Sequence, residues 1–193
     1  MSKTPEEPGK GEPGKAPAVQ TPEQAAFTVG KLTLSELYKI TGPKMLDAAV
    51  RGFTLYEQGK YPEAEKAFRA LSVLNPKEPY YMTALGAAYL AQEKLDEALR
   101  SFTYSISLSG KDIAAYVNRG EVYLQKGMVE EAAKDFKAAV ELDPTGNDGV
   151  VHRARVLWAA AMEVLQSNRT GKDAEAAPAE KSDKKPSKSK KKK

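Results

Sequence analysis

Small and aromatic residues recur along the middle of the chain at a constant spacing of 34 residues. Shifted by that interval, the sequence matches itself without insertion at three positions, occupied by Gly52, Gly86 and Gly120, by Ala64, Ala98 and Ala132, and by Phe68, Phe102 and Phe136. Helix axes that cross about 8–10 Å apart leave no room for a large side chain at the crossing. The pattern therefore predicts closely packed helix pairs, with the aromatic residue filling the gap toward the next pair.

This period, with small residues at positions eight and twenty and an aromatic at position twenty-four, is the signature of tetratricopeptide helical hairpins. The repeats span residues 45–78, 79–112 and 113–146. Pro76 and Pro144 stand at the thirty-second position, where a helix should stop, and Gly110 takes that place in the middle repeat. Turns at 58–60, 92–94 and 126–128 divide each repeat into two helices. The alternative is that the segments are three unrelated helical pairs, and their nine matching positions would then have to arise by chance.

A short helix should precede the repeats. Thr33 and Glu36 have the spacing of a capping box, Leu32 and Leu37 that of a hydrophobic staple, and residues 42–43, Gly-Pro, are expected to end the helix after about two turns. Its apolar face is too small to hold so short a helix in water and must dock on something. That face comprises Leu34, Leu37 and Tyr38. It docks either on the first repeat or across a dimer.

A last helix, at about 148–168, should cap the stack, because the final hairpin would otherwise expose its apolar face. Its apolar stripe consists of Val150, Ala154, Leu157, Ala161 and Leu165. Trp158, the single tryptophan, neighbours this stripe and is expected in core or cap packing, with an interface as the alternative. The sequence thus predicts an all-α domain over residues 31–169, with three tandem hairpins in a right-handed superhelix, a short N-terminal helix and a C-terminal capping helix.

The two ends of the chain differ from this domain in composition. Residues 1–30 are rich in Pro, Gly, Glu and Lys, and residues 170–193 end in a lysine run, so both are expected to be disordered. The net charge of +4 comes from the ends, since residues 31–169 carry 18 basic and 18 acidic side chains. There is no cysteine, no apolar run long enough to span a membrane and no secretory signal pattern at the N-terminus, which favours a cytoplasmic location.

Residues for catalysis or cofactor binding are lacking, so we expect no enzyme, cofactor or metal site. His152 is the only histidine and has no second ligand type spaced for a metal. Residues 9–16, Gly-Lys-Gly-Glu-Pro-Gly-Lys-Ala, approach a phosphate-binding loop, but Ala16 replaces the hydroxyl residue that would bind magnesium and no strand precedes it. The glycosylation pattern at 168–170 means little without secretion.

Stacked hairpins of this kind curve, and the first helix of each lines the concave side. The positions expected to face it are Leu46, Ala49, Val50, Phe53, Tyr56 and Glu57, then Tyr80, Thr83, Ala84, Ala87, Leu90 and Ala91, and finally Ala114, Val117, Asn118, Glu121, Leu124 and Gln125. The result is an apolar trough with a floor of small residues flanked by tyrosines and a phenylalanine. Such a surface suits the side chains of an extended peptide. The alternative is that the chain's own ends cover it.

Some tetratricopeptide proteins hold a C-terminal carboxylate with a clamp of Lys and Asn residues. The matching positions here are Ala49, Phe53, Ala84, Ala114 and Asn118. Four of the five lack the required donor, so a co-chaperone of the carboxylate-clamp type is not expected.

The stretch from Gly52 to Leu108 resembles the class II chaperones of bacterial type III secretion, which hold hydrophobic translocators before export. The resemblance rests on residues 55–61 (LYEQGKY), 68–71 (FRAL), 85–87 (LGA) and 101–105 (SFTYS), and extends from the short helix to about Pro144. It implies three repeats, a cytosolic location, dimerisation through the N-terminal helical region and a groove for an extended client segment containing Pro and Leu. The Pro/Gly-rich leader and lysine tail have no counterpart in that family.

Three functions remain open from the sequence. The first is a non-enzymatic chaperone of secreted translocators, the second a general tetratricopeptide adaptor for protein–protein interactions. The third is binding of nucleic acid or a membrane surface through the lysine tail. Without interleaved aromatics, nucleic-acid binding by that tail would be non-specific and salt-dependent.

Overall fold

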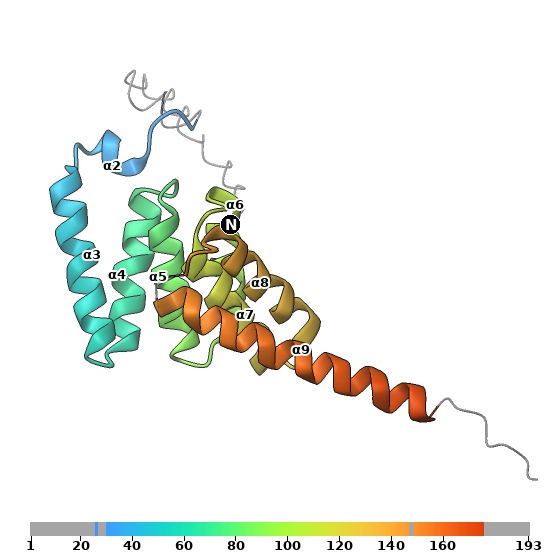
Figure 1. Cartoon of the computed structure of the whole chain (residues 1–193). Helices are drawn as coiled ribbons and strands as arrows, with labels where there is room; N and C mark the ends of the chain where they lie inside the picture. The colour runs from blue at the N-terminus through green and yellow to red at the C-terminus, as the bar shows by residue number, and fades with distance from the viewer. Residues whose placement is uncertain (1–25, 27–29, 147–148, 176–193) are drawn as a thin grey trace, which may run out of the picture.

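The computed structural model describes residues 26, 30–146 and 149–175, and within these ranges its regular elements are helices. Three hairpins follow one another along the chain: α3 (Gly42–Glu57) with α4 (Tyr61–Leu74), α5 (Pro79–Leu90) with α6 (Leu95–Leu108), and α7 (Ile113–Gln125) with α8 (Val129–Leu142). The hairpins stack side by side, and α9 (Gly149–Glu175) closes the row against α8 (Figure 1). The predicted all-α fold of three tandem hairpins with a capping helix is confirmed.

Within each hairpin, a glycine of the first helix faces a phenylalanine of the second. A Cβ placed on Gly86 would lie 2.6 Å from Cε1 of Phe102, and one on Gly120 would lie 2.5 Å from Cε1 of Phe136. At Gly52 the nearest atom, Cζ of Phe68, would be 3.1 Å away. All three phenylalanines are buried. The 34-residue pattern therefore marks the helix crossings, which are tighter in the second and third hairpins than in the first.

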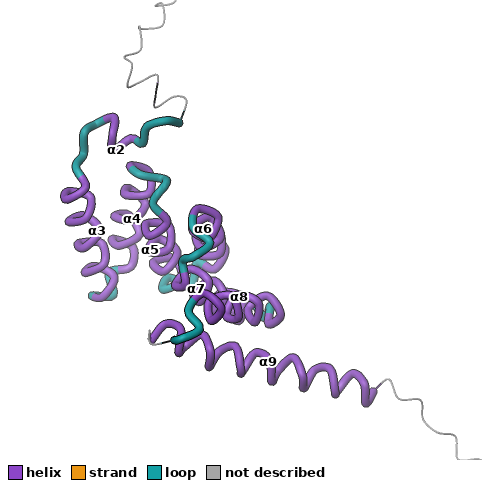
Figure 2. The backbone as a smooth tube through the Cα atoms, turned by 45° about the horizontal axis from the view of Figure 1, so that its top comes forward, coloured by secondary structure: helices purple, strands orange, loops and turns teal. Residues whose placement is uncertain are grey.

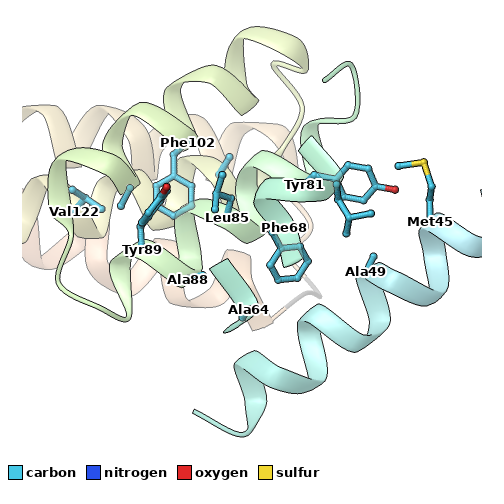
Figure 3. Close-up of a cluster of buried hydrophobic side chains, with 13 residues drawn as sticks. Met45, Ala49, Ala64, Phe68, Tyr81, Leu85, Ala88, Tyr89, Phe102 and Val122 are labelled. Carbon is cyan, nitrogen blue, oxygen red and sulfur yellow. The ribbon is translucent and has the colours of Figure 1, made fainter. Parts of the chain in front are cut away.

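The core runs along the stack from one hairpin to the next. Its larger part joins the first two hairpins and reaches Val122 of α7, and Figure 3 shows Phe68, Tyr81, Leu85 and Phe102 within it. A second cluster lies between the third hairpin and α9, formed by Val117, Ala132, Phe136, Ala139 and Ala154. Half-buried Trp158 packs against this second cluster. The predicted role of the tryptophan in cap packing is thus confirmed.

The turn inside each hairpin needs one residue in the left-handed backbone region. Gly59 and Gly127 adopt φ of +73° there. In the second hairpin the corresponding residue is Glu93, with φ of +58°. A side chain makes this conformation costly, because Cβ approaches the following carbonyl oxygen. The second turn therefore carries backbone strain that the other two avoid.

Polar contacts join the second and third repeats. The hydroxyls of Thr83 and Ser105 hydrogen-bond to each other at 2.7 Å, and Ser105 Oγ donates to Asp112 Oδ2 at 2.9 Å. The other oxygen of Asp112 accepts from the backbone N–H of Ala115 at 3.0 Å and so caps the start of α7. One carboxylate thereby ties α5 and α6 to the next hairpin.

A second polar joint links the first two repeats. Glu65 of α4 is buried and accepts hydrogen bonds from Lys94 Nζ at 2.8 Å and Gln92 Nε2 at 3.0 Å, both in the turn of the second hairpin. Glu65 also pairs with Arg69, which donates to the hydroxyl of Tyr89 at 2.6 Å. The hydrogen bond from Lys94 is the main reason that the pKa of Glu65 is lowered.

The short N-terminal helix, α2 (Leu34–Leu37), has the expected capping box. Thr33 N donates to Glu36 Oε2 at 2.6 Å, and Glu36 N donates to Thr33 Oγ1 at 3.3 Å. Two expectations were wrong: the helix is one turn long, and the Gly-Pro pair at 42–43 begins α3 instead of ending α2. Proline fits the first turn of a helix because its nitrogen needs no acceptor there.

Within the single chain, α2 lies above the first hairpin (Figure 1) and contacts α4, and docking across a dimer stays a prediction. Leu34 and Leu37 are half-buried, whereas Tyr38 is 69% exposed. At the other end, α9 continues to Glu175, past the predicted limit of the cap helix at 168. Most of the predicted leader and tail, residues 1–25, 27–29 and 176–193, lies outside the described residues.

We expect Gly86→Ala to destabilise the protein by about 1–2 kcal/mol, because overpacking against Phe102 outweighs the roughly 1 kcal/mol gained in helix propensity. Gly52→Ala, with its looser crossing, should be close to neutral. Urea unfolding followed by circular dichroism measures both. Adding Phe102→Leu to Gly86→Ala should cost less than the sum of the two single changes. Equal losses for Gly52→Ala and Gly86→Ala would contradict the difference between the crossings.

Glu93→Gly should stabilise the protein by about 0.5–1 kcal/mol, since it relieves a left-handed conformation that costs a non-glycine residue roughly 1–2 kcal/mol. Gly127→Ala is the matched reverse change and should destabilise by a similar amount. Thermal unfolding of the two variants tests the pair, and a lower midpoint for Glu93→Gly would show that the glutamate side chain contributes more than the strain costs.

Candidate peptide-binding groove

The first helices of the first two hairpins enclose an apolar hollow, which we call the central recess. It has a volume of about 110 Å³ and is lined by Phe53, Tyr56, Phe68, Tyr80, Thr83, Ala84 and Ala87. The structure thus brings together the small-residue floor and its aromatic flanks as the sequence placed them. Phe68 of α4 was not among the predicted residues, although its position opposite Gly52 would have placed it beneath this surface.

The recess continues into a shallower hollow along α3 and α5. This second hollow, of about 370 Å³, shares Tyr80 with the central recess and includes Leu46, Ala49 and Tyr81, with Asn75 and Glu78 as polar members. Leu46 is 65% exposed, and Val50 and Phe53 on the same helix are also exposed. Together the two hollows form the groove, an apolar surface that runs along α3 and α5.

Aromatic contacts hold the tyrosines of the groove. The ring of Tyr80 meets that of Phe68 edge-on, with centroids 6.4 Å apart, and that of Tyr81 at 6.0 Å. Tyr56 packs against Tyr61 with centroids 5.4 Å apart. Burial raises the pKa of Tyr56 and of Tyr80, so both hydroxyls stay protonated at neutral pH. They can therefore donate hydrogen bonds to a ligand in the groove.

Three predicted groove residues do not present their side chains to solvent. Ala49, Thr83 and Val117 occupy the fifth position of their repeats, and all three are buried. The fifth position faces the packed interior: Thr83 hydrogen-bonds to Ser105 and Asp112 of its own repeat, and Val117 packs in the cluster beneath α9. Ala49 and Thr83 still border the two hollows, as expected, although little of either side chain is exposed. For Val117 the expectation was wrong, because it lies in the interior. Leu90 is half-buried against the larger core cluster.

In the third repeat, α9 contacts the predicted groove residues. Arg153 Nε lies 3.2 Å from Glu121 Oε1, and Arg153 Nη2 donates to Asn118 Oδ1 at 3.1 Å. Sequence reasoning missed Arg153, because a helical pattern predicts a cap helix without telling which of its side chains reaches α7. The capping helix thus contacts two of the residues predicted for the third repeat's share of the groove, outside the two hollows.

Burial raises the pKa of the Glu121 carboxyl, and the Arg153 guanidinium partly opposes that shift. The same two charges act on Tyr56: burial and then Tyr61 raise its pKa, Arg153 lowers it and Glu121 raises it. A tyrosine of the first repeat is therefore within the electrostatic reach of the third repeat and the cap. A polar cluster of Asn118, Glu121 and Arg153 thus lies outside the two hollows, near the Tyr56 side of the apolar groove.

The positions that match a carboxylate clamp have other surroundings in this structure. Ala49 is buried, Phe53 and Ala84 belong to the apolar recess, and the amide of Asn118 is engaged by Arg153. His152 is exposed, and no group of three or more His, Cys, Asp or Glu side chains suited to a metal occurs in the described ranges. Among the helices of that part of the chain, none has the length and apolar character needed to cross a membrane.

Family models described as tetratricopeptide repeat match residues 51–112 and 113–145. Residues 51–145 of the chain are tetratricopeptide repeats. The matched ranges cover the hairpins that carry the glycine–phenylalanine crossings, apart from the first part of α3. No curated protein matches the sequence.

Among solved structures, the chain is similar to chaperones of type III secretion. The Yersinia enterocolitica translocator chaperone SycD is 28% identical, with a TM-score of 0.62 over 67% of this chain and 98% of that one. SycD in complex with a peptide of the translocator YopD is 28% identical, with a TM-score of 0.58 over 64% and 95%. A type III secretion complex from Aeromonas hydrophila is 28% identical, with a TM-score of 0.64 over 79% and 99%. The resemblance to translocator chaperones is confirmed.

We expect Arg153→Met to destabilise the protein by about 1 kcal/mol at pH 7, in the range of partly exposed ion pairs. Loss of the guanidinium leaves the Glu121 carboxylate without its cation, so the pKa of Glu121 rises further. Because protonation removes the uncompensated charge, the loss should shrink as the pH falls through that raised pKa. Urea unfolding at pH 7 and pH 4 measures the difference.

Arg155→Met is the matched control, since Arg155 donates to the carbonyl oxygen of Pro144 and its charge acts on Asp143, whose pKa is lowered. Because a carboxyl of lowered pKa stays largely ionised at pH 4, the effect of Arg155→Met should change less between the two pH values than that of Arg153→Met. If Arg153→Met cost the same at both, Glu121 would not be the group that Arg153 stabilises.

Proposed function

We propose that this protein is a cytosolic chaperone that binds hydrophobic type III secretion translocators through an extended client segment in its groove. The observation that supports this most directly is the central recess, an apolar hollow between α3 and α5 flanked by half-exposed aromatic rings. An extended segment offers a side chain to such a hollow and backbone groups to its rim. The similar SycD structure holds a peptide of a translocator.

The groove residues proposed to contact the client follow from their exposure. Leu46, Phe53, Tyr56, Tyr80, Ala84 and Ala87 contribute the apolar contact surface. Asn118 and Glu121 would face the client's polar atoms outside the two hollows, together with Arg153. The chemistry of this surface is binding without reaction, so we propose that the protein is not an enzyme.

A general adaptor is the second candidate, because tetratricopeptide repeats serve many interactions and the family models match at that level. The two differ in what they bind: a translocator chaperone keeps a hydrophobic client soluble, whereas an adaptor joins folded partners. Binding through the lysine tail concerns residues outside the described ones. Dimerisation through Leu34, Leu37 and Tyr38 stays a prediction, for which Tyr38 is the exposed member.

Ala87→Leu should fill the central recess and weaken client binding at least tenfold while leaving the melting temperature within a few degrees. The added carbons occupy the hollow that an apolar client side chain would otherwise fill, and binding energy is concentrated in such central pockets. The probe is the labelled YopD segment bound by SycD, measured by fluorescence anisotropy. Co-expression with a hydrophobic translocator, followed by measurement of its soluble fraction, separates chaperone from adaptor.

Ala70→Leu is the control, because it makes the same chemical change at an exposed alanine of α4. It should leave peptide binding and client solubility unchanged. Unaltered binding by a folded Ala87→Leu variant would place the client elsewhere on the protein.

A further inference from the structure

The capping helix α9 is apolar on two opposite sides. Its inner side is buried against the third hairpin through Val151, Ala154 and Ala161. On the other side, Val156 is 57% exposed and Ala159 and Ala160 are also exposed. The whole stretch 156–162 is uncharged and apolar. A helix of this composition is normally covered on every side, whereas a terminal helix needs a polar outer face.

Four residues on the outer side form a regular row, which we call the outer stripe: Arg153, Val156, Ala160 and Glu163. Their spacing of three, four and three residues places them on one side of a helix, as in the contact row of a coiled coil. All four are exposed. A cation begins the stripe, an anion ends it, and small apolar residues lie between.

The outer stripe is complementary to the outer stripe of a second copy that runs in the opposite direction. In an antiparallel pair related by a twofold axis, Arg153 lies opposite Glu163 of the partner subunit, and Val156 lies opposite the partner's Ala160. The axis repeats both contacts, so each stripe end meets the opposite charge. A parallel pair would instead bring Arg153 against the partner's Arg153. The small side chains of Ala159 and Ala160 allow the helix axes to approach closely.

We propose that the occupant of this surface is a second copy of the chain, bound through an antiparallel pairing of the outer stripes. Figures 1 and 2 show α9 at the end of the row of hairpins. The outer stripe lies in the first half of this helix and is exposed there, on the side opposite the residues buried against the third hairpin. About three turns of helix bury much less than the roughly 800 Å² per partner of a stable interface, so the dimer is weak and reversible.

Arg153 can serve this contact and its own subunit together. Its Nε and Nη2 atoms contact Glu121 and Asn118, the side chain is 50% exposed, and a guanidinium has further N–H donors. The central recess is lined by residues of α3, α4 and α5, with none from α9. Arg153 is the one residue that the proposed client surface shares with the outer stripe. Changes at Val156, Ala160 or Glu163 affect only the stripe, and changes in the central recess affect only client binding, so either proposal can fail without the other.

Sedimentation velocity of the full chain, from about 5 to 500 µM, tests the pairing by charge reversal. Wild type should shift from monomer toward dimer over this range. Arg153→Glu and Glu163→Arg should each weaken self-association at least tenfold, because like charges then meet twice. An equimolar mixture of the two variants should associate again, since both contacts become opposite in charge. A monomeric wild type at the highest concentration, or a mixture that stays monomeric, would overturn the proposal.

Glu63→Arg makes the same charge change on the exposed surface of α4 and should leave self-association unchanged. Tyr38→Ser distinguishes the other candidate surface: loss of the dimer in this variant, with the α9 variants unaffected, would place the contact at α2 and reject the outer stripe.

A cysteine experiment covers the case in which Arg153→Glu perturbs folding beside Glu121. The chain has no cysteine, so a disulfide can only join introduced residues. Val156→Cys mixed with Ala160→Cys should yield a disulfide-linked heterodimer under mild oxidation, and faster than Val156→Cys mixed with Glu63→Cys. Equal rates for the two mixtures would rule out the proposed register.

Discussion

The contact of a glycine with a phenylalanine ring inside each hairpin is the constraint on which the rest of the structure depends. It fixes how closely the two helices cross, because the ring occupies the volume that any side chain at the glycine would need. In the first hairpin the same ring also supports the groove: Phe68 lies against Gly52 on one side and meets Tyr80 edge-on on the other. The surface proposed to bind a client therefore rests directly on a helix crossing.

Hydrogen bonds between the hairpins orient them relative to one another, in addition to the apolar packing. Asp112 caps α7 and accepts a hydrogen bond from Ser105, and Glu65 of α4 accepts hydrogen bonds from Lys94 and Gln92. A hydrogen bond needs a defined geometry where apolar contact does not. These contacts fix the orientation of one hairpin against the next, and hence which residues of α3 and α5 face each other across the central recess.

The sequence could predict the crossings and the recess because both follow from a period that the chain repeats three times. Phe53, Tyr56, Tyr80, Ala84 and Ala87 meet in one hollow for this reason. It could not predict that the fifth position of each repeat is buried, since Ala49, Thr83 and Val117 share no chemical character. The sequence also misplaced the boundary between α2 and α3, because a Gly-Pro pair can either end one helix or begin the next.

The capping helix shows where a repeat pattern ceases to be informative. Residues 149–175 occupy the position that the first helix of a fourth hairpin would have, so the stacking predicts which side of α9 is buried. The repeat pattern does not predict what the other sides of α9 contact. Arg153 acquires its role from a neighbour far away in sequence, where Glu121 is buried enough for the pKa of its carboxyl to rise. Covering that carboxylate with a ligand would remove more water from it, and such a cost is met only by a nearby cation or hydrogen-bond donor. The guanidinium of α9 already supplies one, so under the proposed function a client segment can cover Glu121 without leaving its charge unpaired.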